Sequence, residues 1–593
     1  MRRITTSFIV LPLILLVFTL SGQNTYFVNL EGNDANDGLS AATAWRTIAY
    51  AASMSSPVSA GDTVYVKAGD YGEEEIFVDK NYERDAARIS FIGYKDNPGD
   101  IEEFPFSYGD DVDATAMPLI NHQNRLAGES INLSDVYSIT FKNFQIANCI
   151  SGISLWNSIP INSRHIFENI FIKNIGDAYS TAIGVKEADG NIIRNCLIVN
   201  ATGAGMDIWG DNNLIEGCKV YSDESELTEE GTYTSMDYYI VLKGDNNVIR
   251  NCYSERVGNL EDVGHGIQLK ERGENNLFVD CISKNMIGGC FGVRWSGVRN
   301  NEFRNCKAIG GLEDVTGFMI RDGASYNNFN ACVAENCDAG VRFLLSGEDA
   351  DYCGTNNTFS NCIFVNTQWA IDLNSWYYNS APADDNLYVN CVFDNSEYLF
   401  NCERPNTGNR IVNSIIHDVN TFLKGDATLN FEYLYCDFFD NGFPMPVGMG
   451  NIDSNPLFVD GASGDYHLQP ESLCIDNGTA TDAPPVDFDG NARPQGNGYD
   501  IGIFEYTGPS GTREAQGEMG RLFPNPVGTV AFFQLGNDVA VSYKIFSPAG
   551  KIMRIGPVIN GQINFKSIAT GLYFVELYAN DNARIGCFKV LKK

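Results

Sequence analysis

Asn275-Asn276-Leu-Phe-Val-Asp280-Cys281 and Asn300-Asn301-Glu-Phe-Arg-Asn305-Cys306 are two copies of one motif that decides the fold. Its cysteine recurs in steps of 22, 34, 29, 25, 26, 30 and 29 residues, at Cys196, Cys218, Cys252, Cys281, Cys306, Cys332, Cys362 and Cys391. Asn suits a corner because its short amide tolerates the left-handed conformation and can hydrogen-bond an Asn one coil away. A repeat of this length with short apolar runs predicts a solenoid of stacked coils.

The predicted solenoid looks like a right-handed parallel β-helix, and it is expected to span residues 23–507. The strand just before each Asn pair alternates apolar and polar residues, so one set of side chains points inward. The predicted inward residues are Ile183, Val185, Met206, Ile208, Ile240, Leu242, Ile267, Leu269, Phe291, Val293, Phe318 and Ile320. An elongated all-β solenoid of this kind accommodates 593 residues without one large core.

The chain is strongly acidic, with 75 Asp and Glu residues against 41 Lys and Arg residues and a formal charge of -34. Such a charge disfavours binding to nucleic acid or to an anionic membrane. It suits a soluble exported protein, and its carboxylates could also bind Ca²⁺. A monomer is expected.

The N-terminus has the pattern of a cleaved secretory signal peptide over residues 1–22. Arg2 and Arg3 precede an apolar stretch from Phe8 to Leu20, which small and polar residues follow. This stretch is too short for a membrane helix, and no later run is long and apolar enough for one. The sequence therefore predicts export without a membrane span.

Sixteen cysteines in an exported chain raise the question of disulfides. Eight of them occupy the same repeated inward position, where a thiol behaves as a small apolar group. We therefore expect a mostly reduced ladder of cysteines. Cys337, Cys353 and Cys402 fall outside the ladder and are the better candidates for bridges.

The first part of the chain, 26–71, resembles the opening segment of many secreted β-helix proteins. It predicts a strand, an Asn/Asp/Gly loop, a short amphipathic helix and a second strand, with the helix covering the open end of the solenoid. The loop residues Asn33, Asp34, Asn36 and Asp37 are expected to form turns, although they could bind Ca²⁺. Residues 455–506 resemble the terminal segment of such proteins, and 508–519 have the composition of a linker.

Residues 520–593 differ in character from the repeats. Segments such as Leu522-Phe-Pro-Asn-Pro-Val and Gly571-Leu-Tyr-Phe-Val-Glu-Leu alternate apolar and polar residues between turns, which predicts a small antiparallel β-sandwich of about seven strands. Four such segments in order resemble the C-terminal sorting domain of the type IX secretion system of Bacteroidota. The resemblance implies delivery to the cell surface by that machinery.

A column of cations is predicted on the outer surface of the solenoid. The last outward residues of successive strands are Lys186, Trp209, Lys243, Lys270, Arg294 and Arg321, and Asp207 and Gln268 lie one column earlier. Like charges about 4.8 Å apart repel one another. The column therefore indicates a groove for an acidic polymer, in which Trp209 offers an apolar face to a sugar ring. The alternative is a solvated polar face interleaved with acids.

The coil from Cys218 to Cys252 carries an acidic insertion on the same flank. The insertion is Ser222-Asp-Glu-Ser-Glu-Leu-Thr-Glu-Glu-Gly231, and Asp237, Glu255, Glu261, Asp262 and His265 follow it. Long insertions in solenoids gather on the functional face. These carboxylates could bind Ca²⁺ or neutralise the cations.

Two segments near the insertion resemble family 9 pectate lyases, in which an inserted loop is followed by a strand of the type Asp-Gly-Phe-x-x-Lys. They are Asp237-Tyr-Tyr-Ile-Val-Leu-Lys243 and His265-Gly-Ile-Gln-Leu-Lys270. Lys270 keeps the spacing from Gly to Lys, whereas Lys243 is displaced by one residue. The resemblance covers about 150 residues and implies a β-helix enzyme that cleaves a uronate polymer.

Elimination from a uronate chain needs a base and positive charge beside the carboxylate. A lysine crowded by cations has a lowered pKa and can act as the base. We therefore predict Lys270 as the base, with His265 as an alternative, and Lys243 and Arg294 as carboxylate ligands. Further substrate contacts are expected from Trp209, Lys186, Arg321 and Gln268. Asp207, Asp237 and Asp262 are the candidates for a Ca²⁺ site.

Two other functions fit the same fold. A glycoside hydrolase would need two carboxylates about 5–9.5 Å apart, which Asp207 and Asp237 could supply. A surface adhesin or carbohydrate-binding protein would use the column for binding alone.

Overall fold

The computed structural model describes most of the chain in two units, divided after Tyr506. The first unit is described over residues 23–176, 180–223, 236–258, 264–346, 352–373, 382–403, 405–425 and 429–508. The second is described over residues 521–523, 527–534, 542–547, 551–558, 562–578 and 584–593. The predicted signal peptide and nearly all of the predicted linker lie outside these ranges.

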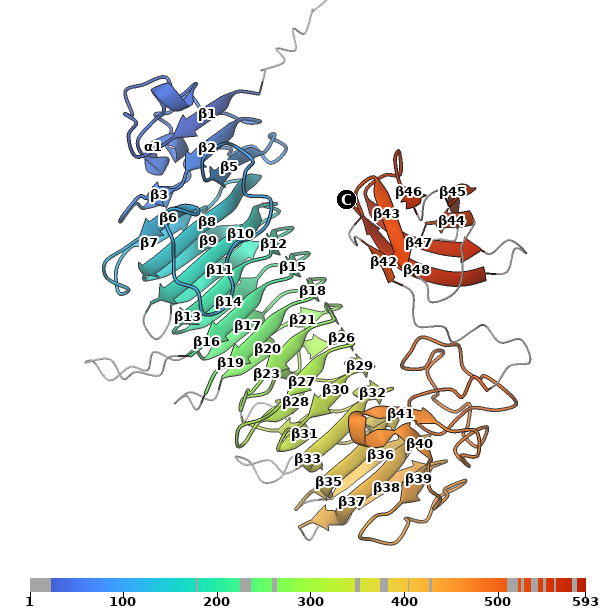
Figure 1. The fold of residues 1–593 in the computed structure, drawn as a ribbon. Coiled ribbons are helices and arrows are strands. Elements are labelled where there is room, and N and C mark those ends of the chain that lie inside the picture. Colours follow the sequence, from blue (N-terminus) through green and yellow to red (C-terminus); the bar gives the residue numbers. More distant parts are fainter. Residues whose placement is uncertain are drawn as a thin grey trace, which may run out of the picture. The chain divides into compact units, whose positions relative to one another are not determined.

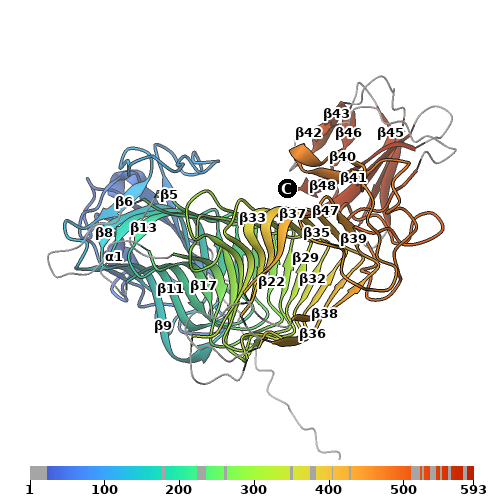
Figure 2. The same cartoon turned by 90° about the horizontal axis from the view of Figure 1, so that it is seen from below.

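The first unit is the predicted right-handed parallel β-helix, in which 37 strands form one continuous sheet wound into coils (Figure 1). Each coil contributes up to three strands, which pair in parallel with their equivalents in the coils before and after. Seen from the direction of Figure 2, β9, β11 and β17 lie in one row along the solenoid, and β29 and β32 lie in another. Because each coil has up to three strands that pair along the solenoid, the solenoid has three long faces.

The first face, here named the site face, is formed by β4 (Ile76–Phe77), β7 (Glu129–Asn132), β9 (Ser151–Ile161), β11 (Thr181–Ala188), β14 (Ala204–Trp209), β17 (Tyr238–Leu242), β20 (His265–Leu269), β24 (Phe291–Arg294), β28 (Thr316–Arg321) and β31 (Ala339–Leu344). The second face is formed by β5 (Ile89–Tyr94), β8 (Ile139–Cys149), β10 (Ile166–Ile175), β12 (Ile192–Arg194), β15 (Leu214–Glu216), β18 (Val248–Arg250), β22 (Leu277–Val279), β26 (Glu302–Arg304), β29 (Asn328–Asn330), β32 (Thr358–Ser360), β34 (Leu387–Val389), β36 (Asn406–Val412) and β38 (Leu429–Leu434).

The third face contains β3 (Gly69–Asp70), β6 (Pro118–Asn121), β13 (Leu197–Ala201), β16 (Lys219–Ser222), β19 (Tyr253–Arg256), β23 (Ile282–Lys284), β27 (Lys307–Ile309), β30 (Val333–Glu335) and β39 (Asp437–Phe439). Near the C-terminal end, β33 (Ile363–Asp372), β35 (Val392–Asn401) and β37 (Ile415–Lys424) run from the third face into the site face. A short pair, β21 (Gly273–Glu274) and β25 (Val298–Arg299), lies at the corner between two coils.

The core consists of side-chain ladders that run along the solenoid. All twelve residues predicted to point inward are at most 1% exposed. Rings at one level stack from coil to coil, as Phe278, Phe303 and Phe329 do with centroids 4.3 and 4.7 Å apart. This repetition buries apolar surface continuously, which is what stabilises a solenoid.

The repeated cysteines form the predicted ladder of buried thiols. All fifteen cysteines whose side chains the structure describes are thiols and are buried. Cys337, Cys353 and Cys402, the candidates for bridges, are among them, and the structure shows no disulfide at these positions. Burial raises the pKa of thiols such as Cys218 and Cys362 well above the usual value, which keeps them protonated.

Asparagines hold the corners for the predicted reasons. Asn246 and Asn275, each the first member of a pair, have φ of 57° and 58°, and the residue before each ladder cysteine is also left-handed, as at Asn251. The second member of each pair points inward and bonds its equivalent in the next coil. The Asn247 amide donates to Asn276 Oδ1 at 3.0 Å, and the Asn276 amide donates to Asn301 Oδ1 at 3.0 Å.

The N-terminal segment forms the predicted strand β1 (Thr25–Val28), short helix α1 (Ile48–Ala52) and strand β2 (Thr63–Lys67), with a 3-10 helix η1 (Ala41–Thr43) before α1. The strands β1 and β2 pair in parallel in the continuous sheet, and α1 buries Ile48, Ala51 and Ala52 in the core. In the acidic loop, the Asp34 carboxylate accepts from the backbone N–H groups of Arg46 and Thr47. The side chains of Asn33 and Asp37 accept from backbone N–H groups two residues ahead. The loop therefore forms the turns that its sequence predicts.

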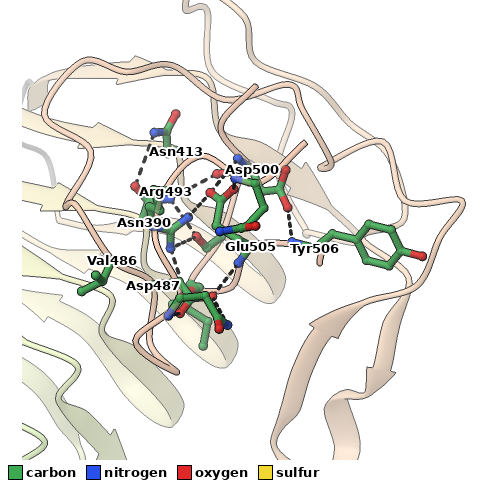
Figure 3. A network of polar contacts seen from close by, with 12 residues as sticks. Asn390, Asn413, Val486, Asp487, Arg493, Asp500, Glu505 and Tyr506 are labelled. Atoms are coloured by element: carbon green, nitrogen blue, oxygen red, sulfur yellow. Dashed lines mark hydrogen bonds and ion pairs between the residues drawn. The ribbon is translucent and has the colours of Figure 1, made fainter. Parts of the chain in front are cut away.

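The C-terminal end is closed by a segment that contains β40 (Phe458–Asp460), the 3-10 helix η2 (Gly461–Ser463) and β41 (Asp465–Leu468). Figure 3 shows its polar centre, in which Arg493 and Glu505 form a fully buried ion pair of 2.7 Å. Arg493 also donates to Asn361 Oδ1, and Asn390 donates to two backbone carbonyls of the segment. Corner asparagines of three coils, including Asn413, thus bind the segment to the solenoid.

The second unit is a small antiparallel sandwich, as predicted. One sheet contains β42 (Arg521–Phe523), β43 (Val530–Gln534) and β46 (Gln562–Asn564). The other contains β44 (Ser542–Phe546), β45 (Ile552–Pro557), β47 (Gly571–Tyr578) and β48 (Arg584–Lys592). Ile545, Val575, Leu577 and Val590 are part of its buried core. Across the residues that the structure describes in both units, no helix is long and apolar enough to cross a membrane.

Candidate functional site

The predicted column of cations exists on the site face. Strand register places Trp156 opposite Lys186, Lys186 opposite Trp209, and Arg294 opposite Arg321. The backbone N–H groups of Lys243 and Lys270 donate to Ile208 and Leu242, which places both lysines between Trp209 and Arg294. The column therefore continues by one residue, Trp156, beyond the predicted set.

Aromatic rings and acids separate the cations of this column. Lys186 Nζ lies 5.4 Å from the ring centroid of Trp156 and 5.7 Å from that of Trp209. Lys243 Nζ lies 3.9 Å from the Trp209 ring on its other side. Cation–π contacts of this kind offset the repulsion between neighbouring like charges. Acids also pair with the column, since Asp207 contacts Lys243 and Asp322 contacts Arg294. The alternative prediction of a polar face interleaved with acids is therefore correct for this part of the column.

Lys243 is the most enclosed lysine of the column, with 8% of its surface exposed. Its Nζ lies 3.2 Å from the carboxylate oxygens of Asp207, whose Oδ1 also accepts from the Trp209 indole at 2.7 Å. Burial lowers the pKa of Lys243 and raises that of Asp207, although each charge partly opposes the shift in the other. Lys243 is therefore held in an internal ion pair.

Lys270 has a different and more open environment. Its Nζ donates to the Tyr238 hydroxyl at 3.0 Å, and the Tyr238 ring stacks on His265 with centroids 4.6 Å apart. His265 Nδ1 lies 3.0 Å from Asp237 Oδ1. Lys270, His265 and Asp237 were predicted as site residues, and Tyr238 links Lys270 to the pair of His265 and Asp237.

Tyr238 was not predicted as a site residue. It pairs in register with His265, because β17 and β20 are adjacent strands of the site face. Its position shortly after the acidic insertion, one residue beyond Asp237, is a signal that could have identified it. We name Asp237, Tyr238, His265 and Lys270 the lysine–tyrosine cluster.

Trp295 turns the corner after the column in an unusual conformation. Its φ is 80°, which is costly for a bulky residue and is often found at functional sites. The ring lies 4.5 Å from the Arg294 guanidinium and 5.4 Å from Lys270 Nζ. The corner thus places an aromatic surface beside the lysine–tyrosine cluster.

The two arginines share one acid. Arg294 Nε lies 2.8 Å and Arg321 Nε 3.7 Å from Asp322 Oδ2, and both arginines donate to Ser346 Oγ. Burial by itself would raise the pKa of Asp322, but hydrogen bonds from Ser346 and the charges of both arginines lower it overall. Arg294 and Arg321 therefore form a fixed cationic group at this end of the column.

Of the predicted residues that the structure describes, Gln268 does not join these groups. Gln268 is 4% exposed, and its amide donates to the Gly289 carbonyl at 2.8 Å, so it stabilises the coil and we leave it out of the proposed site. Asp262, Glu261 and most of the acidic insertion lie outside the described residues. Asp207 and Asp237 are bonded to Lys243 and His265 respectively. Within the described ranges, no three His, Cys, Asp or Glu side chains form a cluster that could hold a metal ion.

Comparison with known protein families identifies two parts of the chain. Residues 129–313 match the right handed beta helix region, and residues 521–588 match the secretion system C-terminal sorting domain. A cell surface glycoprotein of Methanothermus fervidus is 28% identical over 152 residues. The match covers 25% of this chain and about a quarter (24%) of that protein.

Several solved structures resemble the fold at low identity. Pectate lyase Pel9A is 13% identical, with a TM-score of 0.33 over 82% of this chain and 97% of that chain. A mannuronic acid specific polysaccharide family 6 lyase from human gut microbiota is 12% identical, with a TM-score of 0.39 over 68% and 87% of the two chains. The catalytic domain of a GH87 alpha-1,3-glucanase is 11% identical, with a TM-score of 0.38 over 62% and 63%. These values are too low to bear on activity.

The sorting domain indicates delivery by a type IX secretion system to the outside of the cell. The match to the β-helix region contains the strands from β7 to β27. The chain is therefore a secreted or cell-surface right-handed parallel β-helix protein with a secretion system C-terminal sorting domain.

Proposed function

We propose that the protein binds an acidic polysaccharide along the site face and cleaves it by β-elimination at the lysine–tyrosine cluster. The observation that carries this proposal is the hydrogen bond of 3.0 Å between Lys270 Nζ and the Tyr238 hydroxyl. It places two groups that can exchange protons side by side in the middle of a cationic column. A polyanion is the polymer that such a column attracts.

The reaction requires two proton transfers at neighbouring sugar atoms. In a uronate chain, the proton on C5 is removed, the C4–O4 bond breaks, a C4=C5 double bond forms, and the leaving oxygen takes up a proton. Lys270 in its uncharged form accepts the C5 proton, and the Tyr238 hydroxyl donates to the leaving oxygen. Both groups belong to adjacent coils, so strand register fixes their separation.

Negative charge develops on the uronate carboxylate as the C5 proton leaves. Arg294 stands next to Lys270 in the column, and Asp322 and Trp295 hold its guanidinium in place. A guanidinium fixed before the reaction stabilises such charge without reorganisation. His265 remains the alternative base, because Asp237 orients its ring at 3.0 Å and Tyr238 stacks on it.

The proposed mechanism uses no metal ion. The donor set for Ca²⁺ that the sequence suggested is not assembled from described residues, since Asp207 is bonded to Lys243 and Trp209. Asp262 and the acidic insertion are the remaining candidates. Activity measured with and without a chelator tests whether Ca²⁺ takes part.

The test is incubation of the purified protein with a panel of uronate polymers. Elimination produces an unsaturated uronate, which is followed by its ultraviolet absorbance. New reducing ends without that absorbance would instead indicate a glycoside hydrolase. Binding without either product would indicate an adhesin or a carbohydrate-binding protein. Either result overturns the proposed elimination.

A further inference from the structure

A pocket that shares Trp156 with the column opens at the N-terminal end of the site face. Its volume is about 390 Å³, within the usual range for small-ligand sites. The lining residues are Glu129, Asn132, Ile150, Ser151, Ser154, Trp156, Ser180 and Thr181. They come from β7, β9 and the region of β11, which are neighbouring coils of the solenoid. None of these residues was predicted to bind substrate.

The pocket combines an aromatic ring with hydroxyl and amide groups. Trp156 is 60% exposed, which is unusual for so large an apolar side chain. The Asn132 amide donates to Glu129 Oε2 at 3.1 Å, and the hydroxyls of Ser151 and Ser154 lie 2.8 Å apart. An apolar surface next to several hydrogen-bonding groups matches the faces and hydroxyls of a sugar ring.

A glycine, Gly184, lies beside two of the lining residues, Thr181 and Trp156. Gly184 lies between Ser154 and Asp207 in strand register. A Cβ at this position would lie 2.7 Å from Thr181 Oγ1 and 3.5 Å from Trp156 Nε1. A larger residue would therefore fill the space beside the Trp156 ring.

The charge in the pocket is opposite to that of the adjoining column. Glu129 is the one ionisable residue among the lining residues, whereas the next column members after Trp156 are Lys186, Trp209 and Lys243. A carboxylate accepts hydrogen bonds from sugar hydroxyls but repels a uronate. The pocket thus favours an uncharged ring, and the column favours an acidic one.

We propose that the pocket is a subsite for a neutral sugar, so that the substrate is a mixed polysaccharide in which neutral residues alternate with or flank uronates. The identification of the polymer rests on the proposed function, whereas binding of a neutral sugar by the pocket does not. Trp156 is four coils from Lys270, which is about 19 Å at ~4.8 Å per coil. One extended chain can therefore occupy both places.

The experiment measures binding by calorimetry with the full secreted protein. The probes are a panel of neutral disaccharides and a matched panel of oligouronates. Neutral sugars are expected to bind, and Trp156→Ala should weaken their binding at least about fivefold. Glu129→Gln should reduce the preference for neutral over acidic probes. Tyr326→Ala is the control, because Tyr326 is similarly exposed but lies at a corner outside the pocket.

Two results would overturn the proposal. In the first, no neutral probe binds, or Trp156→Ala binds all of them as well as the parent protein does. In the second, oligouronates compete with neutral probes for the pocket and Glu129→Gln changes nothing. Cleavage of a pure oligouronate is measured in parallel, and Lys270→Ala should lose it while still binding the neutral probes as the parent protein does. The failure of the subsite is thereby distinguished from the failure of the lyase.

Discussion

Lys243 and Lys270 occupy adjacent positions of one column, yet their surroundings suit different tasks. Lys243 lies between the Trp209 ring and the Asp207 carboxylate with little exposed surface. Lys270 contacts the Tyr238 hydroxyl, lies 5.4 Å from the Trp295 ring and is partly exposed. Enclosure and an ion pair keep Lys243 in place, whereas Lys270 can reach a bound polymer.

We therefore expect Lys270→Ala to abolish turnover while polymer affinity changes by less than about tenfold, because a base acts mainly in the transition state. Steady-state kinetics and equilibrium binding on the same polymer measure the two effects. Lys243→Ala, the matched control, removes an ion pair from the interior and should lower the thermal midpoint more than Lys270→Ala does. Loss of turnover in Lys243→Ala but not in Lys270→Ala would place the base in the other coil.

The corner asparagines show how one residue type serves two purposes within a coil. Asn275 is exposed and left-handed, with φ of 58°, and its role is to turn the chain. Asn276 is 1% exposed and donates to the Gly244 carbonyl and to Asn301 Oδ1. The first position requires a residue that adopts the left-handed conformation, and the second requires an amide that hydrogen-bonds the neighbouring coils.

Substitutions at the two positions should therefore differ. Asn275→Gly should leave stability nearly unchanged, since glycine adopts this φ freely. Asn276→Ala leaves partners in two coils unsatisfied and should lower the free energy of unfolding by about 1–3 kcal/mol. Urea denaturation of the two variants and the parent protein tests this. Equal losses at both positions would contradict the division of roles.

The segment that closes the C-terminal end contains a buried acid, Asp500, whose pKa is raised. Burial, reinforced by the charges of Glu505 and Asp476, raises the pKa of Asp500 to about 7, while hydrogen bonds from Asp476 and Tyr506 oppose the shift. Because this folded-state pKa lies above the unfolded value near 4, the folded protein binds the proton more tightly. The resulting stability is present at low pH and is lost as pH rises from about 4 to about 7.

We expect Asp500 to make the closing segment less stable at pH 8 than at pH 5, by on the order of 2 kcal/mol. Asp500→Asn should flatten this dependence, because the side chain no longer ionises. Hydrogen exchange of residues 455–506 at the two pH values reports on the segment itself. The exposed Asp96 provides a control substitution, Asp96→Asn, and an unchanged pH dependence in Asp500→Asn would count against the assignment.

The sequence repeats made the fold of the β-helix predictable. The candidate site was only partly predictable, because its side-chain contacts do not follow from the repeats. A register established by many Cys and Asn repeats places Lys186, Lys243 and Arg321 in one column without knowledge of any contact. Trp156 was missed because β9 precedes the first ladder cysteine and its pairing with β11 shifts after Lys186. Tyr238 and Asp322 were missed because alternation says which face a residue occupies but not which neighbour its side chain meets.

The two units have different tasks, and this separation gives the last prediction. Residues up to Tyr506 form one compact unit with its own core and closing segment, while the sorting domain has a separate core. Removal of residues 520–593 should therefore leave the thermal midpoint and the polymer binding of the β-helix unchanged. Delivery to the cell surface should fail, however, and the truncated chain should remain in the periplasm.

Fractionation of cells that produce either form measures where the protein is located, and calorimetry of the purified truncated chain provides the control for folding. If the truncated chain still reaches the cell surface, residues 520–593 are not the sorting signal. If the truncated chain unfolds, the β-helix depends on those residues for its stability.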